Sequence, residues 1–124
     1  MATKALNLTF KLSTDGNING IFDLDTTESD VVTFNDGAVT GNSLSVTHSA
    51  PIDIVAAAVS TQTYVFIKNT DVTNFIKLKT AAGATYGKLL PGEFNFVGVY
   101  PSVGLEVQAD TATCVVEYAI FTKN

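Results

Sequence analysis

The sequence predicts an all-β protein, a single-domain antiparallel β-sandwich with a jelly-roll-like arrangement. Three observations support this fold class. Thr, Val and Ile together make up 38 of the 124 residues, a composition suited to pleated, half-buried surfaces. Apolar and polar residues alternate with period two in many short segments, and no window shows the three-and-four spacing of a helix. Turn-forming Gly, Pro, Asn and Asp recur roughly every eight to twelve residues, as in sandwiches and small barrels.

The first half of the chain carries five predicted strands. The clearest covers residues 5–12, in which every second residue is apolar. The next three, 18–24, 30–35 and 43–48, are each bounded by Gly, Asn or Asp. Pro51 then opens PIDIVAAAVS, which is predicted to be a strand buried on both faces, with a helical turn at the three alanines as the alternative.

The second half is more regular. Residues 64–69 and 74–79 alternate well and are predicted to form a hairpin around the short segment NTDVT. Pro91-Gly92 has the residue types of a type II turn, because Pro presets φ and Gly supplies the positive φ. Further strands are predicted over 86–90, 93–99, 105–108 and 112–121. No repeat or linker divides the chain, so the prediction is one domain over residues 1–124.

Charge and hydropathy exclude several partners. All seven basic residues are lysine and the net charge is -5, so the chain is poorly equipped to neutralise phosphates, and nucleic-acid binding is not expected. The longest aliphatic run, 54–59, is far too short to cross a bilayer, so no membrane partner is expected. No secretory-signal pattern opens the chain, which predicts a protein that is made and kept in a reducing cytoplasm. The single cysteine, Cys114, agrees with this because it can form no internal disulfide.

One segment matches the opening of a calcium-binding loop. Asp15, Asn17, Asn19 and Gly20 reproduce the D-x-N-x-N-G pattern, in which alternate oxygens converge on one cation. The twelfth position is Thr26 rather than the required glutamate, and no helix pattern flanks the segment. The same residue types are common in hairpin turns, so a turn is the preferred prediction and calcium binding is the alternative. No metal or other cofactor is predicted.

No residue set predicts an enzyme. Segment 83–88 differs from a phosphate-binding loop, because Ala82 and Leu89 stand where that loop needs Gly and Ser or Thr. His48 is the only histidine, so a His-rich metal site cannot form, and no nucleophile and carboxylate can be assigned to it as a hydrolytic triad. It is predicted to be an ordinary residue at the end of a strand. Cys114 is predicted to be a small core residue. No carboxylate pair can be singled out for acid–base work.

The aromatic residues are the remaining candidates for a functional site. Phe94, Phe96 and Tyr100 share one face of their predicted strand, and Tyr64 and Phe66 lie together on another. The first interpretation is that they belong to the sandwich core. The functional interpretation is that Phe94, Phe96 and Tyr100, together with exposed strand edges, form a subunit interface.

Three segments of the C-terminal half carry a resemblance to a known family. YVFIKNTDVTNFIKLKT, KLLPGEFNFVGV and CVVEYAIF resemble the recurring hairpin, turn and closing strand of small all-β virion proteins of tailed bacteriophages. The resemblance covers residues 64–121. It implies a non-enzymatic structural protein of the virion, a capsid decoration (cement) protein that binds and stabilises the shell of the major capsid protein. It also implies homo-oligomers, often trimers.

Other functions stay open beside this one. Within the structural class, the alternative is a neck, tail or fibre-associated knob protein of the phage. From a different class, a carbohydrate-binding module shares the fold and would show aromatic side chains on a flat face or groove. A calcium-dependent adhesion domain would depend on Asp15, Asn17 and Asn19.

Overall fold

The computed structural model describes residues 3–18, 22–57, 63–100 and 102–123. Every regular element in these residues is a β-strand, and the strands pair antiparallel, which confirms the predicted all-β class. No helix in the described ranges has the length and apolar character needed to span a membrane. The chain divides into two compact units, one reaching to Asp36 and one covering Gly37 to Lys123. The prediction of one domain over the whole chain stays a prediction.

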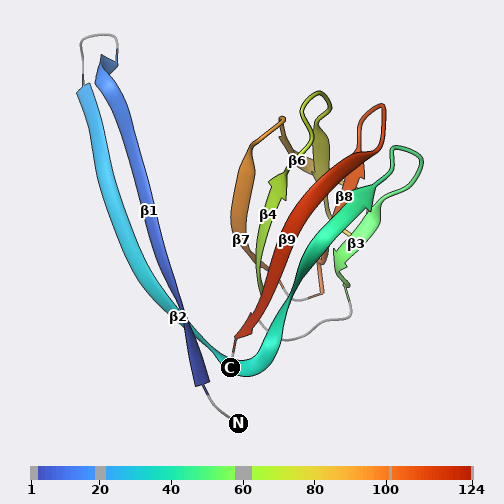
Figure 1. The fold of residues 1–124 in the computed structure, drawn as a ribbon, viewed down its shortest axis with the longest axis horizontal. Coiled ribbons are helices and arrows are strands. Elements are labelled where there is room, and N and C mark those ends of the chain that lie inside the picture. Colours follow the sequence, from blue (N-terminus) through green and yellow to red (C-terminus); the bar gives the residue numbers. More distant parts are fainter. Residues whose placement is uncertain (1–2, 19–21, 58–62, 101, 124) are drawn as a thin grey trace. The chain divides into compact units, whose positions relative to one another are not determined.

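The first unit is a two-stranded hairpin. β1 (Thr3–Ile18) pairs with the first part of β2 (Phe22–Val46), from Ile18 opposite Phe22 to Thr3 opposite Asn35 (Figure 1). The register shifts once, between Ser13 and Asn17. The alternation predicted for residues 5–12 therefore lies within a longer strand.

β2 contains the predicted strand 30–35 and most of the predicted strand 43–48. The predicted strand 18–24 is divided, because Ile18 ends β1, Phe22 begins β2, and residues 19–21 lie outside the described residues. Residues 22–46 run as one strand, so the breaks expected on either side of 30–35 are absent. Its Asp36-Gly37 step, which has the residue types of a turn, instead marks the border between the two compact units. Gly41 in the second unit allows a close strand approach, because a Cβ there would lie 2.9 Å from the carbonyl oxygen of Tyr118. Gly41 is thus needed for contact between strands and not for a turn.

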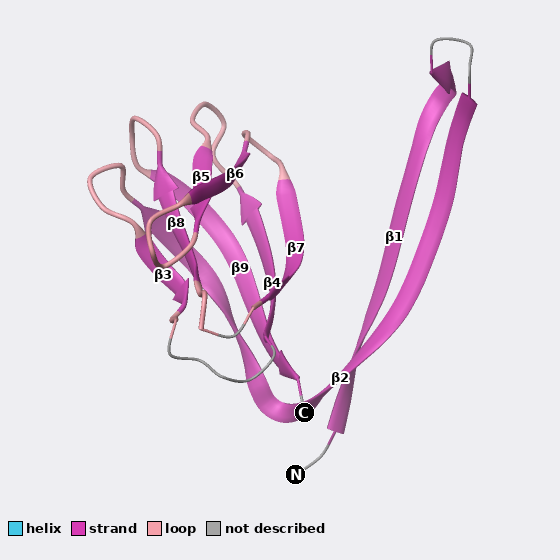
Figure 2. Ribbon diagram, turned by 180° about the vertical axis from the view of Figure 1, so that it is seen from behind, coloured by secondary structure: helices cyan, strands magenta, loops and turns pink. Residues whose placement is uncertain are grey.

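The second unit is the predicted sandwich. One sheet has the order β2-β9-β4-β7 and the other has the order β3-β8-β5-β6 (Figure 2). Successive strands alternate between the two sheets, except that β5 and β6 pair within one sheet, and this is the strand order of an eight-stranded jelly roll. The strands are β3 (Ile52–Val55), β4 (Thr63–Asn69), β5 (Ile76–Lys79), β6 (Thr85–Leu89), β7 (Phe94–Val99), β8 (Leu105–Ala109) and β9 (Cys114–Lys123).

The core of the sandwich is filled largely by the inward-facing side chains of its strands. Buried and half-buried residues alternate along β4, β5 and β8, as period two requires. The buried row consists mainly of Val, Ile and Leu, and fully burying one such side chain stabilises the fold by roughly 1.5–3 kcal/mol. Its fully buried apolar members include Val46, Val65, Ile67, Ile76, Leu105, Val107 and Val116.

The segment between β4 and β5 is a corner of the sandwich and not the predicted hairpin. β4 pairs with β7 and β9, whereas β5 pairs with β6 and β8, so the two strands lie in different sheets. The fully buried Asn69 holds the corner, because its Nδ2 donates to the carbonyl oxygens of Asn74 (2.9 Å) and Leu89 (3.1 Å). The Asn69 Oδ1 accepts the backbone N–H of Asp71 at 3.0 Å.

Asp71 continues the same corner. Its carboxylate accepts the backbone N–H groups of Asn74 at 2.6 Å and of Thr73 at 2.9 Å. These two hydrogen bonds hold the pKa of Asp71 below its ordinary value, because they favour the charged form.

This shift makes the corner sensitive to acid. A carboxyl whose pKa is lower in the folded state adds stability above its unfolded pKa, and that stability is lost as the pH falls through the folded value. We expect Asp71→Asn to lower the melting temperature at neutral pH. As the pH is lowered from neutral through and below about 4, its melting temperature should converge with that of the wild type. Thermal melts of both proteins across this range measure the difference, and a constant offset at all pH values would contradict the assignment.

Two tight turns shape the remainder of the sandwich. Gly92 has φ of 81°, and the N–H of Glu93 donates to the carbonyl oxygen of Leu90 at 3.0 Å, which is the geometry predicted for Pro91-Gly92. Gly104, between β7 and β8, has φ of 75° and is buried. A Cβ at Gly104 would lie only 2.8 Å from the carbonyl oxygen of Val55. The strand predicted from Pro51 is shorter than expected, since β3 ends at Val55.

Candidate functional site

The outer face of one sheet carries a group of four aromatic side chains. On β4, the inward positions are taken by the fully or almost fully buried Thr63, Val65, Ile67 and Asn69, so Tyr64 and Phe66 point outward. On β7, the buried Val99 and the core-packed Val97 mark the inward row, so Phe94 and Phe96 point outward as well. We call Tyr64, Phe66, Phe94 and Phe96 the aromatic face.

Strand register brings these four rings together. β4 and β7 are neighbours, with Phe66 directly opposite Phe96 and Tyr64 opposite Gly98. Because Gly98 has no side chain, the Tyr64 ring packs diagonally on Phe96, with ring centroids 5.9 Å apart and planes within 7°. Phe66 makes the parallel diagonal contact with Phe94 at 6.2 Å and an angle of 35°. Such diagonal pairs are within reach for aromatic side chains on neighbouring strands.

The aromatic face remains open to solvent. Phe94 is 66% exposed, and the other three side chains are half-buried. Exposed aromatic groups of this kind mark interaction sites on soluble domains. A shallow depression of about 420 Å³ adjoins Phe94 and is lined by Lys88, Leu89, Gly92, Glu93 and Phe94. The surface therefore combines rigid apolar rings with nearby charged groups, which suits a protein interface.

The placement of Phe94, Phe96 and Tyr100 corrects the first interpretation of these residues. They do not belong to the core: Phe94 and Phe96 lie on the outer face, and Tyr100 follows β7 and is 73% exposed. The reason is that both faces of β4 and of β7 carry apolar side chains. The face with the smaller, β-branched side chains fills the space between the sheets, and the aromatic face is left outside. Their role as a subunit interface stays a prediction.

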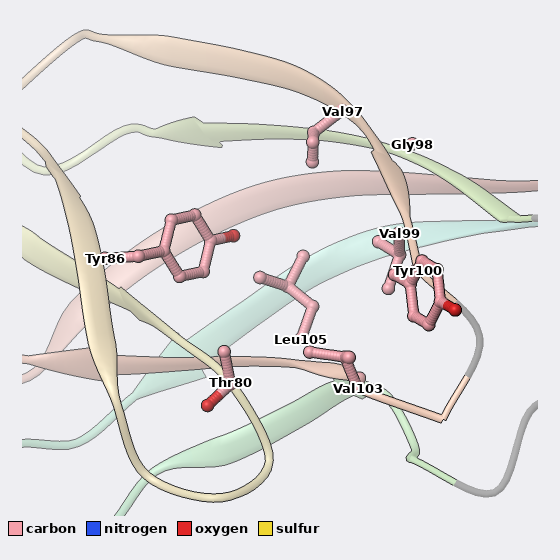
Figure 3. A pocket seen from close by; sticks show the side chains of 9 residues that line it. Thr80, Tyr86, Val97, Gly98, Val99, Tyr100, Val103 and Leu105 are labelled. Carbon is pink, nitrogen blue, oxygen red and sulfur yellow. The ribbon is translucent and has the colours of Figure 1, made fainter.

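Tyr100 lies apart from the aromatic face, beside a small hollow. The hollow has a volume of about 140 Å³ and opens where the terminal strands of the two sheets, β7 and β6, approach (Figure 3). Tyr86 points into it from β6, and partial burial raises the pKa of that phenol. Small-molecule sites usually enclose about 300–1,000 Å³, so the hollow is too small to argue for such a ligand.

The other residues singled out in the sequence are placed as follows. Asp15 and Asn17 lie in β1, whereas Asn19 falls outside the described residues, so the calcium alternative is not decided. His48 is exposed just after β2, and its carbonyl oxygen accepts from Gln108 Nε2 at 2.9 Å. Cys114 is fully buried as predicted, and burial raises the pKa of its thiol.

Lys88, at the end of the glycine-containing segment 83–88, extends from strand β6. Its Nζ lies 4.9 Å from the centre of the Phe75 ring, a cation–π contact. The segment is therefore a turn followed by a strand, as the sequence indicated. Among the residues that the structure describes, no group of three or more His, Cys, Asp or Glu is arranged to hold a metal ion.

Sequence reasoning missed one pair of carboxylates. Asp53 on β3 lies directly opposite Glu106 on β8. Partial burial, together with the hydrogen bond and the charge of Asp53, raises the pKa of Glu106, and Lys79 partly offsets the shift. The two strands are far apart in sequence, so only the register of β3 with β8 reveals the pair. Because Asp53 is exposed, the pair lacks the water exclusion that acid–base sites use.

No protein-family model matches the chain, and no curated protein matches it.

Proposed function

We propose that the protein is a non-enzymatic structural protein of a tailed-phage virion, a capsid decoration protein that binds and stabilises the shell of the major capsid protein. The observation that carries the proposal is the aromatic face, a rigid apolar surface on the outside of a jelly roll. Decoration acts through buried contact area between neighbouring bodies, and an exposed aromatic surface on a stiff sheet can supply it. The resemblance of residues 64–121 to small phage virion proteins directs the proposal to this kind of assembly.

The proposal is tested on virus particles. Gradient-purified tailed-phage particles from the source that encodes this chain should contain the protein at a constant number of copies per particle. Shells stripped of the protein should disassemble at a lower temperature, and adding it back should restore the original temperature. Particles that lack the protein would overturn the proposal. Gold-labelled antibody bound at the neck or tail would instead support the neck, tail or fibre-associated alternative.

A single exposed ring tests whether the aromatic face makes the contact. Phe94→Ala should change the free energy of unfolding by less than about 1 kcal/mol, because Phe94 is mostly exposed. Its affinity for stripped shells should fall by about tenfold or more, as for an interface hot spot. Tyr86→Ala is the matched control, since Tyr86 is an exposed aromatic residue on the other sheet. Equal affinities for the two variants would place the contact elsewhere.

A carbohydrate-binding module is the second candidate function, and one observation favours it. Aromatic rings on the outer face of a sheet are the feature that sugar-stacking modules use, and the aromatic face provides one exposed ring, Phe94, beside three half-buried ones. Affinity electrophoresis in gels containing soluble polysaccharides measures this binding. Retardation that disappears in Phe94→Ala and persists in Tyr86→Ala would support the module, whereas equal mobility in all gels would remove it.

A further inference from the structure

The outer edge of β1 is an open edge of the hairpin in the first unit. β1 is the terminal strand of its sheet, so within the described part of the chain its outer edge has no pairing partner. An isolated two-stranded hairpin is marginally stable in water, and three or more strands with an apolar face are needed for independent stability. The hairpin therefore needs further strands, which the open edge of β1 can accept.

One face of the hairpin carries a continuous apolar row along β1. Every second β1 side chain is apolar on this face, and Phe10 (57% exposed) and Leu12 (44% exposed) are open to solvent. On the same face of β2, the residues opposite Leu8, Phe10 and Leu12 are polar or charged, namely Asp30, Glu28 and Thr26. Leu6 instead faces Val32, which is buried. We call the residues Leu6, Leu8, Phe10 and Leu12 the β1 row.

Charge distinguishes the two edges of the hairpin. Asp25, Glu28 and Asp30 lie on β2, and all three are exposed. Like charges that face each other across a strand pair are destabilising, and charged side chains are a common means of blocking strand edges. Joining two β2 edges would bring six of these carboxylates together. On β1, the corresponding stretch 5–13 carries one charge, that of Lys11.

We propose that two copies of this chain associate by antiparallel pairing of their β1 strands, forming a four-stranded sheet across a two-fold axis at Thr9. In this register, each residue of one β1 row lies opposite a residue of the other β1 row, with Leu8 opposite Phe10 and Leu6 opposite Leu12 of the second copy. It separates the two Lys11 positions by about 14 Å along the strands. The carboxylates of Asp25, Glu28 and Asp30 in both copies lie on the outer strands, away from the seam. This pairing does not depend on the proposed function.

Engineered cysteines at matched positions test the pairing. Thr9 and Ser29 are both exposed and lie opposite each other in the hairpin, Thr9 on β1 and Ser29 on β2. In the proposed sheet the two Thr9 Cα atoms are about 4.5–5.5 Å apart, which a disulfide can span. The two Ser29 positions are three strand spacings apart, about 14 Å, which a disulfide cannot span. The buried Cys114 is present in both variants.

Mild oxidation of the full chain should therefore convert most of Thr9→Cys, and only a trace of Ser29→Cys, into a disulfide-linked dimer on a non-reducing gel. Equal cross-linking of the two variants, or none in either, would overturn the proposal.

Added charge gives a second, reversible test. Thr9→Asp places like charges across the seam and should weaken dimerisation by about tenfold or more in sedimentation equilibrium. Ser29→Asp adds the same charge to the edge that already carries carboxylates and should leave the dissociation constant within about twofold of the wild type. A wild-type protein without a dimer at any soluble concentration, or equal weakening by both substitutions, would overturn the proposal.

Discussion

Replacing Asn69 by alanine is expected to lower the free energy of unfolding by about 3–4 kcal/mol. The Asn69 side chain is fully buried, and its amide makes two donated hydrogen bonds and one accepted hydrogen bond. Alanine would leave the carbonyl oxygens of Asn74 and Leu89 and the N–H of Asp71 without these partners, and each buried group left unpaired costs about 1–3 kcal/mol. Because these groups join β4 to the corner before β5, the loss should act on both sheets.

Urea unfolding followed by circular dichroism measures this effect. Asn69→Asp offers a chemical control, because it keeps the size and one acceptor but removes both donors, and it should be at least as destabilising as alanine. Asn42→Ala offers a positional control: Asn42 is exposed, and its side chain accepts a local hydrogen bond from the N–H of Ser43. A loss for Asn69→Ala no larger than that for Asn42→Ala would show that the buried amide does not hold the corner.

Gly104→Ala is the second large expected effect, with a loss of about 3 kcal/mol or more. Two costs combine at this position. The positive φ costs an alanine about 1–2 kcal/mol, and the new Cβ would approach the Val55 carbonyl oxygen to 2.8 Å, a distance that real Cβ atoms essentially never show. The backbone on both sides is held by strand pairing, since Val55 pairs with Leu105. The clash cannot be relieved without moving β3.

A substitution at a second glycine, Gly92, measures the cost of the positive φ without the cost of the clash. Gly92 has nearly the same φ, 81°, but nothing lies within 4 Å of its Cβ position. Gly92→Ala should therefore cost only the conformational term, about 1–2 kcal/mol, in the same unfolding measurement. The difference between the two variants is the cost of the clash. Equal losses would mean that β3 yields to the added methyl group.

Alternation and turn residues predicted most of the sandwich. The strands β6, β7, β8 and β9 appear close to their predicted bounds, because each has a period-two pattern and is bordered by turn residues. The sequence did not predict that β4 and β5 lie in different sheets. A short polar segment such as NTDVT suits a hairpin and a corner equally well. The choice depends on the pairing of β4 with β9, about fifty residues further along the chain.

The sequence identified Phe94 and Phe96 as candidate site residues, but it did not predict that their side chains face outward from the sandwich. Phe94 and Phe96 were recognised as one row, yet period two does not say which row of a strand faces inward. The preference for burying large rings favours the aromatic row on β7, whereas the structure buries Val99 and packs the partly buried Val97 against the core. The β-branched character of the opposite row on β4 is the signal that could have indicated this, since such residues suit the tightly packed interior of a sheet pair.

The position of β9 has a consequence for how the protein reaches its fold. β9 lies between β2 and β4, and it pairs with β4 from Thr122 opposite Thr63 to Val116 opposite Asn69. An inner strand of the sheet is therefore synthesised after every strand that it joins. Until β9 emerges from the ribosome, β2 and β4 have no common neighbour, and their facing edges are open to pairing with other nascent chains. We expect slow folding that is completed only after β9 has been synthesised, typical of folds dominated by contacts between distant segments.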